Sequence, residues 1–577
     1  MVCLLYSLIL EGCASQFPEV LNRSHIDPVL DLKKTAEFIQ SQLRNCEEHS
    51  SWCLPPEPSS LPRRVLDVGS KEQDKIYLLE THGEKGLYIT LSHCWGSKPI
   101  LKTTKENYDH RRIGIPWSKM PATFKDAIKI TRALHIQYLW IDSLCIIQGD
   151  ILDWEQQSAS MADIYSSCYL NLAATAASNS NGGLFSKRWI PSIHPNPSER
   201  KRHSPKSQAV SIVQDRSTGD IGKVFVRYSL ANAHMDVLIL EAGGRNYNVI
   251  ESAPLLTRAW AYQERLLSPR TVNFHSAELT WDCGFAFNCE CGQLSTQEPA
   301  AELDGETVFP KYKLFTPDIE SRNLVTPWLD VVTNFSKLKL TFSMDKLPAL
   351  AGIASRFADQ IQSDYLAGIW QADVGRGLLW RVDFEPSEDL DTRFTSARAN
   401  PYRAPTWSWA SIDLVNNRTC SVWVSYAFLG PSFEMGLLDS RFEVLDWKCD
   451  ISGSNPFGRV TDGHLLVKGA ALSTTLWYDG NRDTDSDIDN GSEYDWHLGI
   501  ESILDLFYYD IDVRGDGNSY VLEGETIIAL LISFGPRACA ILLAPSKRRS
   551  GKYERIGVAS IDKKHFEYAE EMVLDII

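Results

Sequence analysis

The 577-residue sequence predicts an α/β module with a mainly parallel sheet and flanking helices, followed by a β-rich C-terminal region. Two observations support this prediction. Between residues 66 and 185, short apolar runs alternate with segments in which apolar residues recur at helical spacing. Beyond about residue 400, strand-like apolar runs predominate. Because strands that alternate with helices are joined by right-handed crossovers, neighbouring strands of the first region should be parallel.

The elements of the α/β module follow one another in a regular order. They are a strand at 87–92, a helix at 121–134, a strand at 138–141, a helix at 154–168, a strand at 170–174, a helix at 258–267 and two short strands at 271–274 and 278–281. Pro121 marks the start of its helix, since proline fits the first turn, where backbone N–H groups have no helical partner.

The sequence predicts four regions along the chain. They are an N-terminal extension (1–60), the α/β module (61–290) with a polar insertion at about 187–250, a helical extension (291–400) and the β-rich region (401–577). The longest later apolar stretch, 526–545, is interrupted by Gly535-Pro536-Arg537. Two short apolar pieces with a turn between them predict a β-hairpin and not a membrane span.

Charge and cysteine content exclude several classes of protein. The chain has 58 Lys and Arg against 74 Asp and Glu, and a net charge of −16 argues against general binding to nucleic acid. Thirteen cysteines are too dispersed for a disulfide scaffold, and an odd number cannot all pair. The apolar start lacks a basic segment and ends at Glu11, unlike a signal peptide. We therefore expect a cytoplasmic protein without a membrane span.

Tryptophan is enriched, with 17 residues in the chain. Trp407 and Trp409 stand two positions apart, which places both on one face of a predicted strand. We expect these large side chains to pack in a core or between domains.

Polar side chains follow two strands of the predicted sheet. The first strand leads into Ser92, His93, Cys94 and Trp95, and the second into Asp142. Ligands of open parallel sheets bind beyond the carboxyl ends of the strands. One interpretation is a nucleophilic Cys94 with His93 as its base and Asp142 as the orienting group. Adjacent strand residues point to opposite faces, however, which favours a core cysteine beside a structural histidine.

The helix at 258–267 places a carboxylate on an apolar stripe. Trp260 and Glu264 stand four residues apart and therefore share one helix face. A desolvated Glu264 would have a raised pKa and could act as an acid or base. The alternative, which these residues favour by themselves, is an ion pair of Glu264 with Arg258, Arg265 or Arg270.

Two candidate metal motifs are weak. Cys283, Cys289 and Cys291 match no zinc spacing, and no fourth ligand is obvious. The alternating aspartates at 483–489 resemble the start of a calcium loop but lack its glycine and closing glutamate. The sequence therefore predicts no metal site and no required cofactor.

Three separated blocks together resemble the fungal heterokaryon-incompatibility (HET) domain. They are YITLSHCWG at 88–96, YLWIDSLCIIQ at 138–148 and RAWAYQERLLS at 258–268. The resemblance covers roughly residues 60–285, and Ile147 stands where the family commonly has Asn. Residues 345–411 look like the extension common in long HET proteins. The resemblance implies non-self recognition in which fusion of incompatible fungal cells triggers programmed cell death, with an unidentified incompatibility partner.

HET domains are in turn distantly similar to Toll/interleukin-receptor (TIR) domains. The stretch from Trp260 to Glu264 resembles a helix of plant TIR domains, some of which cleave NAD. By this similarity Glu264 would engage the nicotinamide ribose of NAD as a substrate. Five residues would shape the pocket together with Trp260 and Gln263, namely Ser92, His93, Cys94, Trp95 and Asp142. Two alternatives remain open: a non-enzymatic module that acts by self-association, and a Cys/His hydrolase centred on Cys94.

Overall fold

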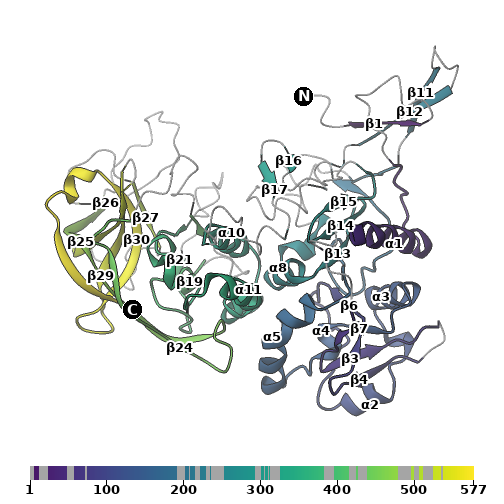
Figure 1. The fold of residues 1–577 in the computed structure, drawn as a ribbon, viewed down its shortest axis with the longest axis horizontal. Coiled ribbons are helices and arrows are strands. Elements are labelled where there is room, and N and C mark those ends of the chain that lie inside the picture. The colour runs from purple at the N-terminus through teal and green to yellow at the C-terminus, as the bar shows by residue number, and fades with distance from the viewer. Residues whose placement is uncertain are drawn as a thin grey trace. The chain divides into compact units, whose positions relative to one another are not determined.

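The computed structural model describes residues 6–11, 24–48, 53, 57–71, 75–191, 202–206, 208–214, 221–228, 230, 234, 252–292, 301–303, 306–308, 311, 325–382, 396–414, 424–426, 438–478, 496–498, 506–510, 524–534 and 537–577. The chain divides into two compact units, Met1–Arg322 and Asn323–Ile577, which Figure 1 colours from purple to teal and from green to yellow. Each unit is described by itself.

An eight-stranded sheet forms the centre of the first unit. Its order is β15-β14-β13-β8-β6-β7-β3-β4. The strands are β3 (Arg64–Asp67), β4 (Tyr77–Glu80), β6 (Tyr88–Ser92), β7 (Tyr138–Trp140), β8 (Leu170–Ala173), β13 (Arg270–Phe274), β14 (Leu279–Cys283) and β15 (Phe287–Cys289). The four central strands β7, β6, β8 and β13 are parallel, as predicted for the helix-connected strands.

The prediction of a mainly parallel sheet is nevertheless wrong, because both edges are antiparallel. Strand β3 pairs antiparallel with β4 and β7, and β14 pairs antiparallel with β13 and β15. The segments that join β13 to β14 and β14 to β15 have only a few residues. Such short turns allow a hairpin but cannot return the chain for a parallel pairing. The sheet is therefore mixed, with a parallel centre.

Helices flank this sheet. They are α1 (Leu32–Glu48), α2 (Tyr108–Ile113), α3 (Ala122–Ala133), α4 (Asp142–Cys145), α5 (Ile151–Ser166) and α8 (Ala259–Leu267). Figure 1 shows α5 and α8 on one side of the sheet and α1 and α3 on the other. The predicted helix after Pro121 is confirmed, with Pro121 as its N-cap. The second buried strand ends at Trp140, and Asp142 opens the single-turn helix α4.

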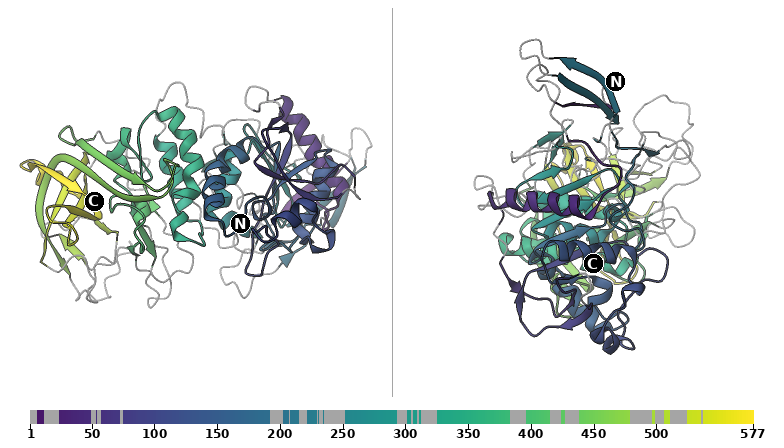
Figure 2. Two further views of the ribbon diagram at one scale, coloured as in Figure 1. Left: turned by 90° about the horizontal axis from the view of Figure 1, so that it is seen from below. Right: turned by 90° about the vertical axis from the view of Figure 1, so that its right-hand side faces the viewer.

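The N-terminal segment and the insertion form a small sheet together. Strand β1 (Tyr6–Glu11) pairs with β12 (Ile221–Tyr228), which pairs with β11 (Gln208–Gln214), all antiparallel. The right-hand view of Figure 2 shows these three strands close to the label N. No helix in the described ranges is long and apolar enough to cross a membrane.

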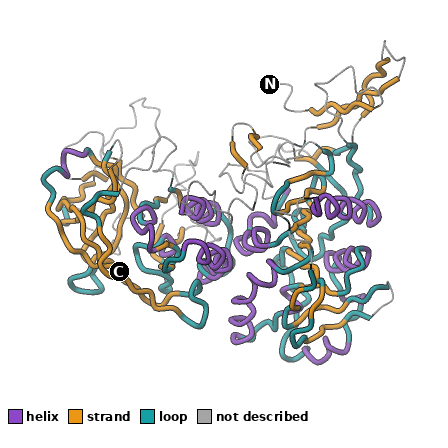
Figure 3. The backbone as a smooth tube through the Cα atoms, viewed as in Figure 1, coloured by secondary structure: helices purple, strands orange, loops and turns teal. Residues whose placement is uncertain are grey.

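Strands dominate the C-terminal part of the second unit, as predicted (Figure 3). The sheet order is β24-β25-β28-β29-β30-β27, with β26 paired to β25 and β31 paired to β25 and β30. The strands are β24 (Glu443–Ile451), β25 (Val460–Tyr478), β26 (Trp496–Leu498), β27 (Leu506–Tyr509), β28 (Thr526–Phe534), β29 (Ala538–Pro545), β30 (Tyr553–Ile561) and β31 (Glu570–Ile576). The antiparallel pairing of β28 with β29 confirms the predicted hairpin. The helices α10 (Val325–Ser336), α11 (Ala351–Ile361) and α12 (Val374–Gly377) precede these strands.

Seven tryptophans are among the largest fully buried side chains of the residues that the structure describes. They are Trp140 and Trp281 in the first unit and Trp328, Trp370, Trp380, Trp407 and Trp409 in the second. Trp409 begins a 3-10 helix, η8 (Trp409–Ser411), and Trp407 lies in the turn before it. The predicted shared strand face is therefore wrong, but the complete burial of both side chains confirms their packing role.

Candidate functional site

The Glu264 side chain lies at the carboxyl end of the central strand β6. Glu264 belongs to helix α8 and is buried, with 8% of the residue exposed. Its hydrogen-bond partners are the hydroxyl groups of Ser92, the last residue of β6, and of Tyr165, near the end of α5. The structure thus brings Glu264 to the sheet edge at which the sequence predicted a site.

The environment of Glu264 favours its protonated form. Burial raises the pKa of this carboxyl to about 7, and the negative charge of Asp142 acts in the same direction. The Ser92 hydrogen bond, the charge of Arg258 and the Tyr165 hydrogen bond partly oppose the rise. A carboxyl group that titrates near neutral pH can both accept and release a proton under physiological conditions.

Two of the three arginines considered as ion-pair partners of Glu264 contact other groups. Arg265 contacts Asp282 instead, with 3.0 Å between Nε and Oδ2. The Arg258 Nη1 donates a 2.7 Å hydrogen bond to the carbonyl of His93 and influences Glu264 only through its charge. Hydroxyl groups are instead the hydrogen-bond partners of the Glu264 carboxylate.

Asp142 joins the first two sequence blocks. Its Oδ2 accepts a 2.8 Å hydrogen bond from the indole nitrogen of Trp95, and its Oδ1 accepts one of 2.6 Å from the backbone of Ser143. The His93 Nδ1 lies 3.8 Å from the Asp142 Oδ1, too far for a hydrogen bond. Burial lowers the pKa of His93, and its ring packs edge-to-face on Phe124. His93 is therefore a neutral, buried ring beside a partly exposed carboxylate.

The geometry does not support Cys94 as a nucleophile. Its thiol packs in an apolar cluster with Ala173, Leu255 and Ala261. Burial raises the pKa of Cys94, although Arg258 lies close enough to oppose the rise by its charge and a hydrogen bond. Since the thiolate is the reactive form, these surroundings suppress nucleophilic attack.

Gly96 makes the turn that ends the first block. Its φ of +76° lies in the left-handed region, and a Cβ at this position would stand 2.4 Å from the Cβ of Asn179. Only glycine satisfies both conditions without a shift of the backbone. The turn directs the chain away from β6 immediately after Trp95.

A cleft of about 410 Å³ adjoins Trp95. Its lining contains two lysines, several polar side chains and several apolar ones. The lining residues are Trp95, Lys98, Pro99, Ile100, Leu101, Ser118, Lys119, Met120, Pro121, Asn179, Ser180 and Asn181. This volume lies within the range of small-molecule sites. Trp95 is the one predicted site residue in the lining, and through its indole nitrogen it also contacts Asp142.

The other predicted residues lie on α8. Gln263 is buried next to Glu264, whereas Trp260 is half-buried at the first turn of the helix. Tyr165 and Asn171 are not among the predicted site residues. Asn171 Oδ1 accepts a 3.0 Å hydrogen bond from Thr90 and lies 3.1 Å from the Ser92 hydroxyl oxygen. A tyrosine in a buried helical stripe is a usable signal, since its hydroxyl needs a partner inside the protein.

Two of the three cysteines considered as metal ligands come together in the structure. Cys289 and Cys291 lie beside His234 and Glu278, whereas Cys283 groups with Cys46 and Cys53. The aspartates at 483–489 lie outside the described residues.

Comparison with known proteins gave one match. Residues 88–264 match the family model described as "Heterokaryon incompatibility protein (HET)". The matched range contains the first two sequence blocks and ends at Glu264 within the third. No curated protein and no solved structure matched the chain.

Proposed function

We propose that residues 88–264, which match the heterokaryon incompatibility (HET) family model, form a HET domain, and that the chain is a fungal non-self recognition protein in which this domain triggers programmed cell death. An incompatibility partner protein would release this activity. The proposed site of action is the cytoplasm, where cell fusion brings the two partners together.

For the chemistry of the domain, we propose cleavage of NAD with Glu264 as the central residue. The observation on which this depends is the buried Glu264 carboxyl, whose pKa of about 7 lies far above that of an ordinary glutamate. In the reaction, water replaces nicotinamide at the ribose carbon and yields ADP-ribose, nicotinamide and a proton. The ionised Glu264 would hold a ribose hydroxyl group and stabilise the positive charge that develops on the sugar.

The neighbouring cleft supports a nucleotide ligand. Lys98 and Lys119 lie in its lining, and two ammonium groups suit a pyrophosphate. A ligand that extends from the cleft past Trp95 would meet Asp142 and then the edge of β6. Ser92 and Tyr165 would orient Glu264, and Trp260 and Gln263 would complete the surroundings on α8.

Purified full-length protein tests this chemistry. We expect it to consume NAD, and we expect Glu264→Ala and Glu264→Gln to reduce the rate at least about 100-fold, the size of effect typical for a positioned acid or base. Glu155→Gln, at an exposed position of α5, is the matched control and should keep the wild-type rate. Circular dichroism should show that each variant is folded. Equal rates in wild type and folded Glu264→Gln protein would remove Glu264 from the mechanism.

A second candidate function is a non-enzymatic module that acts by self-association. The observation in its favour is that Glu264 is absent from the lining of the cleft. Inducible expression in a fungal host separates the two functions. If toxicity survives Glu264→Gln and follows the oligomeric state, the domain acts by assembly; if toxicity is lost while the protein accumulates normally, it acts by chemistry.

A further inference from the structure

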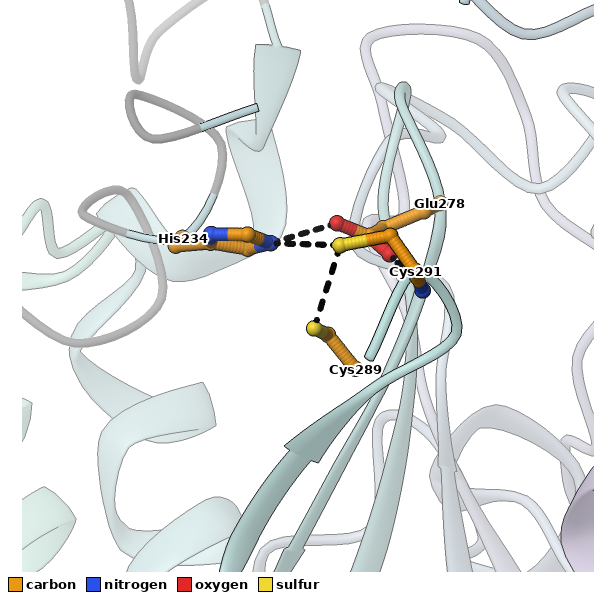
Figure 4. A group of neighbouring side chains, drawn as sticks. All are labelled: His234, Glu278, Cys289 and Cys291. Carbon is orange, nitrogen blue, oxygen red and sulfur yellow. Dashed lines mark hydrogen bonds and ion pairs between the residues drawn. The ribbon is translucent and has the colours of Figure 1, made fainter. Parts of the chain in front are cut away.

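Four potential metal ligands lie close together beside β14 and β15, the two outermost strands on one side of the central sheet. His234 comes from the insertion, Glu278 precedes β14, Cys289 ends β15, and Cys291 follows two residues later. Their ligand atoms all lie within 4.8 Å of one another, and all four residues are buried (Figure 4).

The distances within this group are close to those of a tetrahedral site. The Cys291 Sγ lies 3.7 Å from the His234 Nε2 and 3.3 Å from the Cys289 Sγ. The Glu278 Oε1 lies 2.5 Å from the same His234 nitrogen. Four ligands at the usual zinc bond lengths stand about 3.3–3.8 Å apart. Shifts of less than about an ångström would therefore admit a zinc ion among these atoms.

The carboxylate of Glu278 is also held by a backbone group. Its second oxygen, Oε2, accepts a 2.8 Å hydrogen bond from the backbone N–H of Cys291. This bond leaves Oε1 directed at His234, as Figure 4 shows. An outer hydrogen bond that orients a ligand is a usual feature of metal sites.

Apolar side chains surround the group. Cys289 and Cys291 belong to a buried cluster with Ile26, Ile190, Leu230, Ala253, Leu256, Ala277 and Phe287. Thiolates and a carboxylate in such surroundings are costly unless a cation compensates their charge. A divalent ion would provide this compensation and would bind all four side chains at once.

We propose that His234, Glu278, Cys289 and Cys291 bind one Zn²⁺ ion in a closed structural site. Two thiolates and an imidazole favour zinc over the hard cations Mg²⁺ and Ca²⁺, which take oxygen ligands. Four protein ligands leave no position for water or substrate, so the site is structural and not catalytic.

The ion would fasten the insertion to the sheet. His234 lies 44 residues before Glu278 and 57 before Cys291. The site also lies beside Leu256, in the 3-10 helix η4 (Pro254–Thr257) that leads into α8. Zinc binding would therefore stabilise both the insertion and the approach to the Glu264 helix.

A second thiol group must be separated from this site in any measurement. Cys46, Cys53 and Cys283 are buried with their sulfur atoms within 4.8 Å of one another. The part of the chain that the structure describes offers this trio no fourth ligand. We propose no metal for it, but three thiols could retain zinc during purification.

Metal analysis of the full-length protein, purified under reducing conditions, tests the proposal. We expect Cys289→Ser/Cys291→Ser protein to contain one zinc ion per chain less than wild type. Cys145→Ser/Cys168→Ser is the matched control, since both thiols are buried in the same unit and belong to neither group; its zinc content should equal that of wild type. Wild-type protein without zinc, or equal zinc in the Cys289/Cys291 variant, would overturn the proposal.

X-ray absorption and cobalt substitution test it where the double variant fails to fold. Both use Cys283→Ser protein, in which the thiol trio is broken. We expect the zinc spectrum to fit two sulfur and two nitrogen or oxygen ligands. Co²⁺ in the same protein should give the intense visible bands of a tetrahedral site and a thiolate charge-transfer band. A fit with only nitrogen and oxygen ligands, or the weak spectrum of octahedral Co²⁺, would contradict the proposal.

Discussion

The indole nitrogen of Trp95 donates a 2.8 Å hydrogen bond to the Asp142 carboxylate, although the two residues are 47 positions apart. Trp95 follows β6 and Asp142 opens α4, so the bond joins the carboxyl ends of two adjacent parallel strands. The same tryptophan lines the neighbouring cleft. This contact therefore links the cleft to the polar groups at the sheet edge.

Replacement of Trp95 by phenylalanine should destabilise the first unit by about 1.5–3 kcal/mol, the usual contribution of a hydrogen bond to a charged group. The substitution keeps an aromatic ring but removes the donor to Asp142. Urea unfolding monitored by circular dichroism measures the effect. Trp117→Phe, at a more exposed position, is the control and should change the free energy of unfolding by less than about 0.5 kcal/mol. Equal effects of the two substitutions would show that the bond to Asp142 contributes nothing.

The raised pKa of Glu264 should make stability depend on pH. The carboxyl titrates near its ordinary pKa of 4.5 in the unfolded chain and at about 7 in the folded protein. The folded state therefore binds the proton more tightly than the unfolded chain. Below about pH 4.5 the carboxyl is protonated in both states and does not lower the free energy of unfolding. As the pH rises from 4.5 to 7, the free energy of unfolding falls, and above about pH 7 the loss reaches about 3 kcal/mol.

Glu264→Gln removes this titration and isolates its effect. The difference in free energy of unfolding between the variant and wild type should grow in favour of the variant from pH 5 to pH 8, by up to about 3 kcal/mol. Thermal and urea unfolding at both pH values measure the difference. Glu155→Gln, which is exposed on α5, should show no such gain. A constant difference between Glu264→Gln and wild type across this range would mean that the folded carboxyl is not shifted.

Gly96→Ala should be more harmful than Gly83→Ala. Both glycines have a positive φ, of +76° and +99°, so alanine introduces backbone strain of about 1–2 kcal/mol at either position. At Gly96 the new Cβ would also meet the Cβ of Asn179 at 2.4 Å, whereas nothing lies within 4 Å at Gly83. Overpacking adds about 1–3 kcal/mol. Urea unfolding of the two variants tests this order, and similar losses would contradict the close packing of the turn.

Asp153→Asn should destabilise the first unit by about 3–5 kcal/mol, because it leaves a buried guanidinium without its counter-charge. The Arg64 Nη2 lies 2.6 Å and 2.5 Å from the two Asp153 oxygens, and both side chains are buried. Asp153 also accepts a 2.8 Å hydrogen bond from the backbone of Ile147, in the second sequence block. Calorimetry of the full chain measures the loss, with Glu155→Gln as an exposed control on the same helix. A loss below about 1 kcal/mol would show that solvent compensates Arg64.

Local patterns predicted the helices and central strands because their apolar spacing decides which residues are buried. Pro121 predicted the start of α3, and the interruption at 535–537 predicted the β28–β29 hairpin. The antiparallel edges of the first sheet were missed because the parallel pairing inferred for the helix-connected strands was extended to the whole sheet, whereas the edge strands β3, β4, β14 and β15 pair antiparallel. Of the two hydroxyl partners of Glu264, Ser92 was expected in the same pocket from the family resemblance, whereas Tyr165 was missed because α5 and α8 are far apart in the sequence. The same limit concealed His234 and Glu278, which no local metal motif connects to Cys289 and Cys291.

Cys94 should be less reactive in the folded protein than in the unfolded chain. Burial raises its pKa, which lowers the fraction of the reactive thiolate at a given pH. At pH 8 we expect iodoacetamide to label Cys94 more slowly in buffer than in urea, as measured by mass spectrometry of its peptide. Arg258→Met should slow the labelling further, since the arginine charge and hydrogen bond favour the thiolate. Faster labelling in the folded protein would instead identify an activated thiol and restore the Cys/His hydrolase, because only a lowered pKa or an adjacent base produces that excess over the unfolded chain.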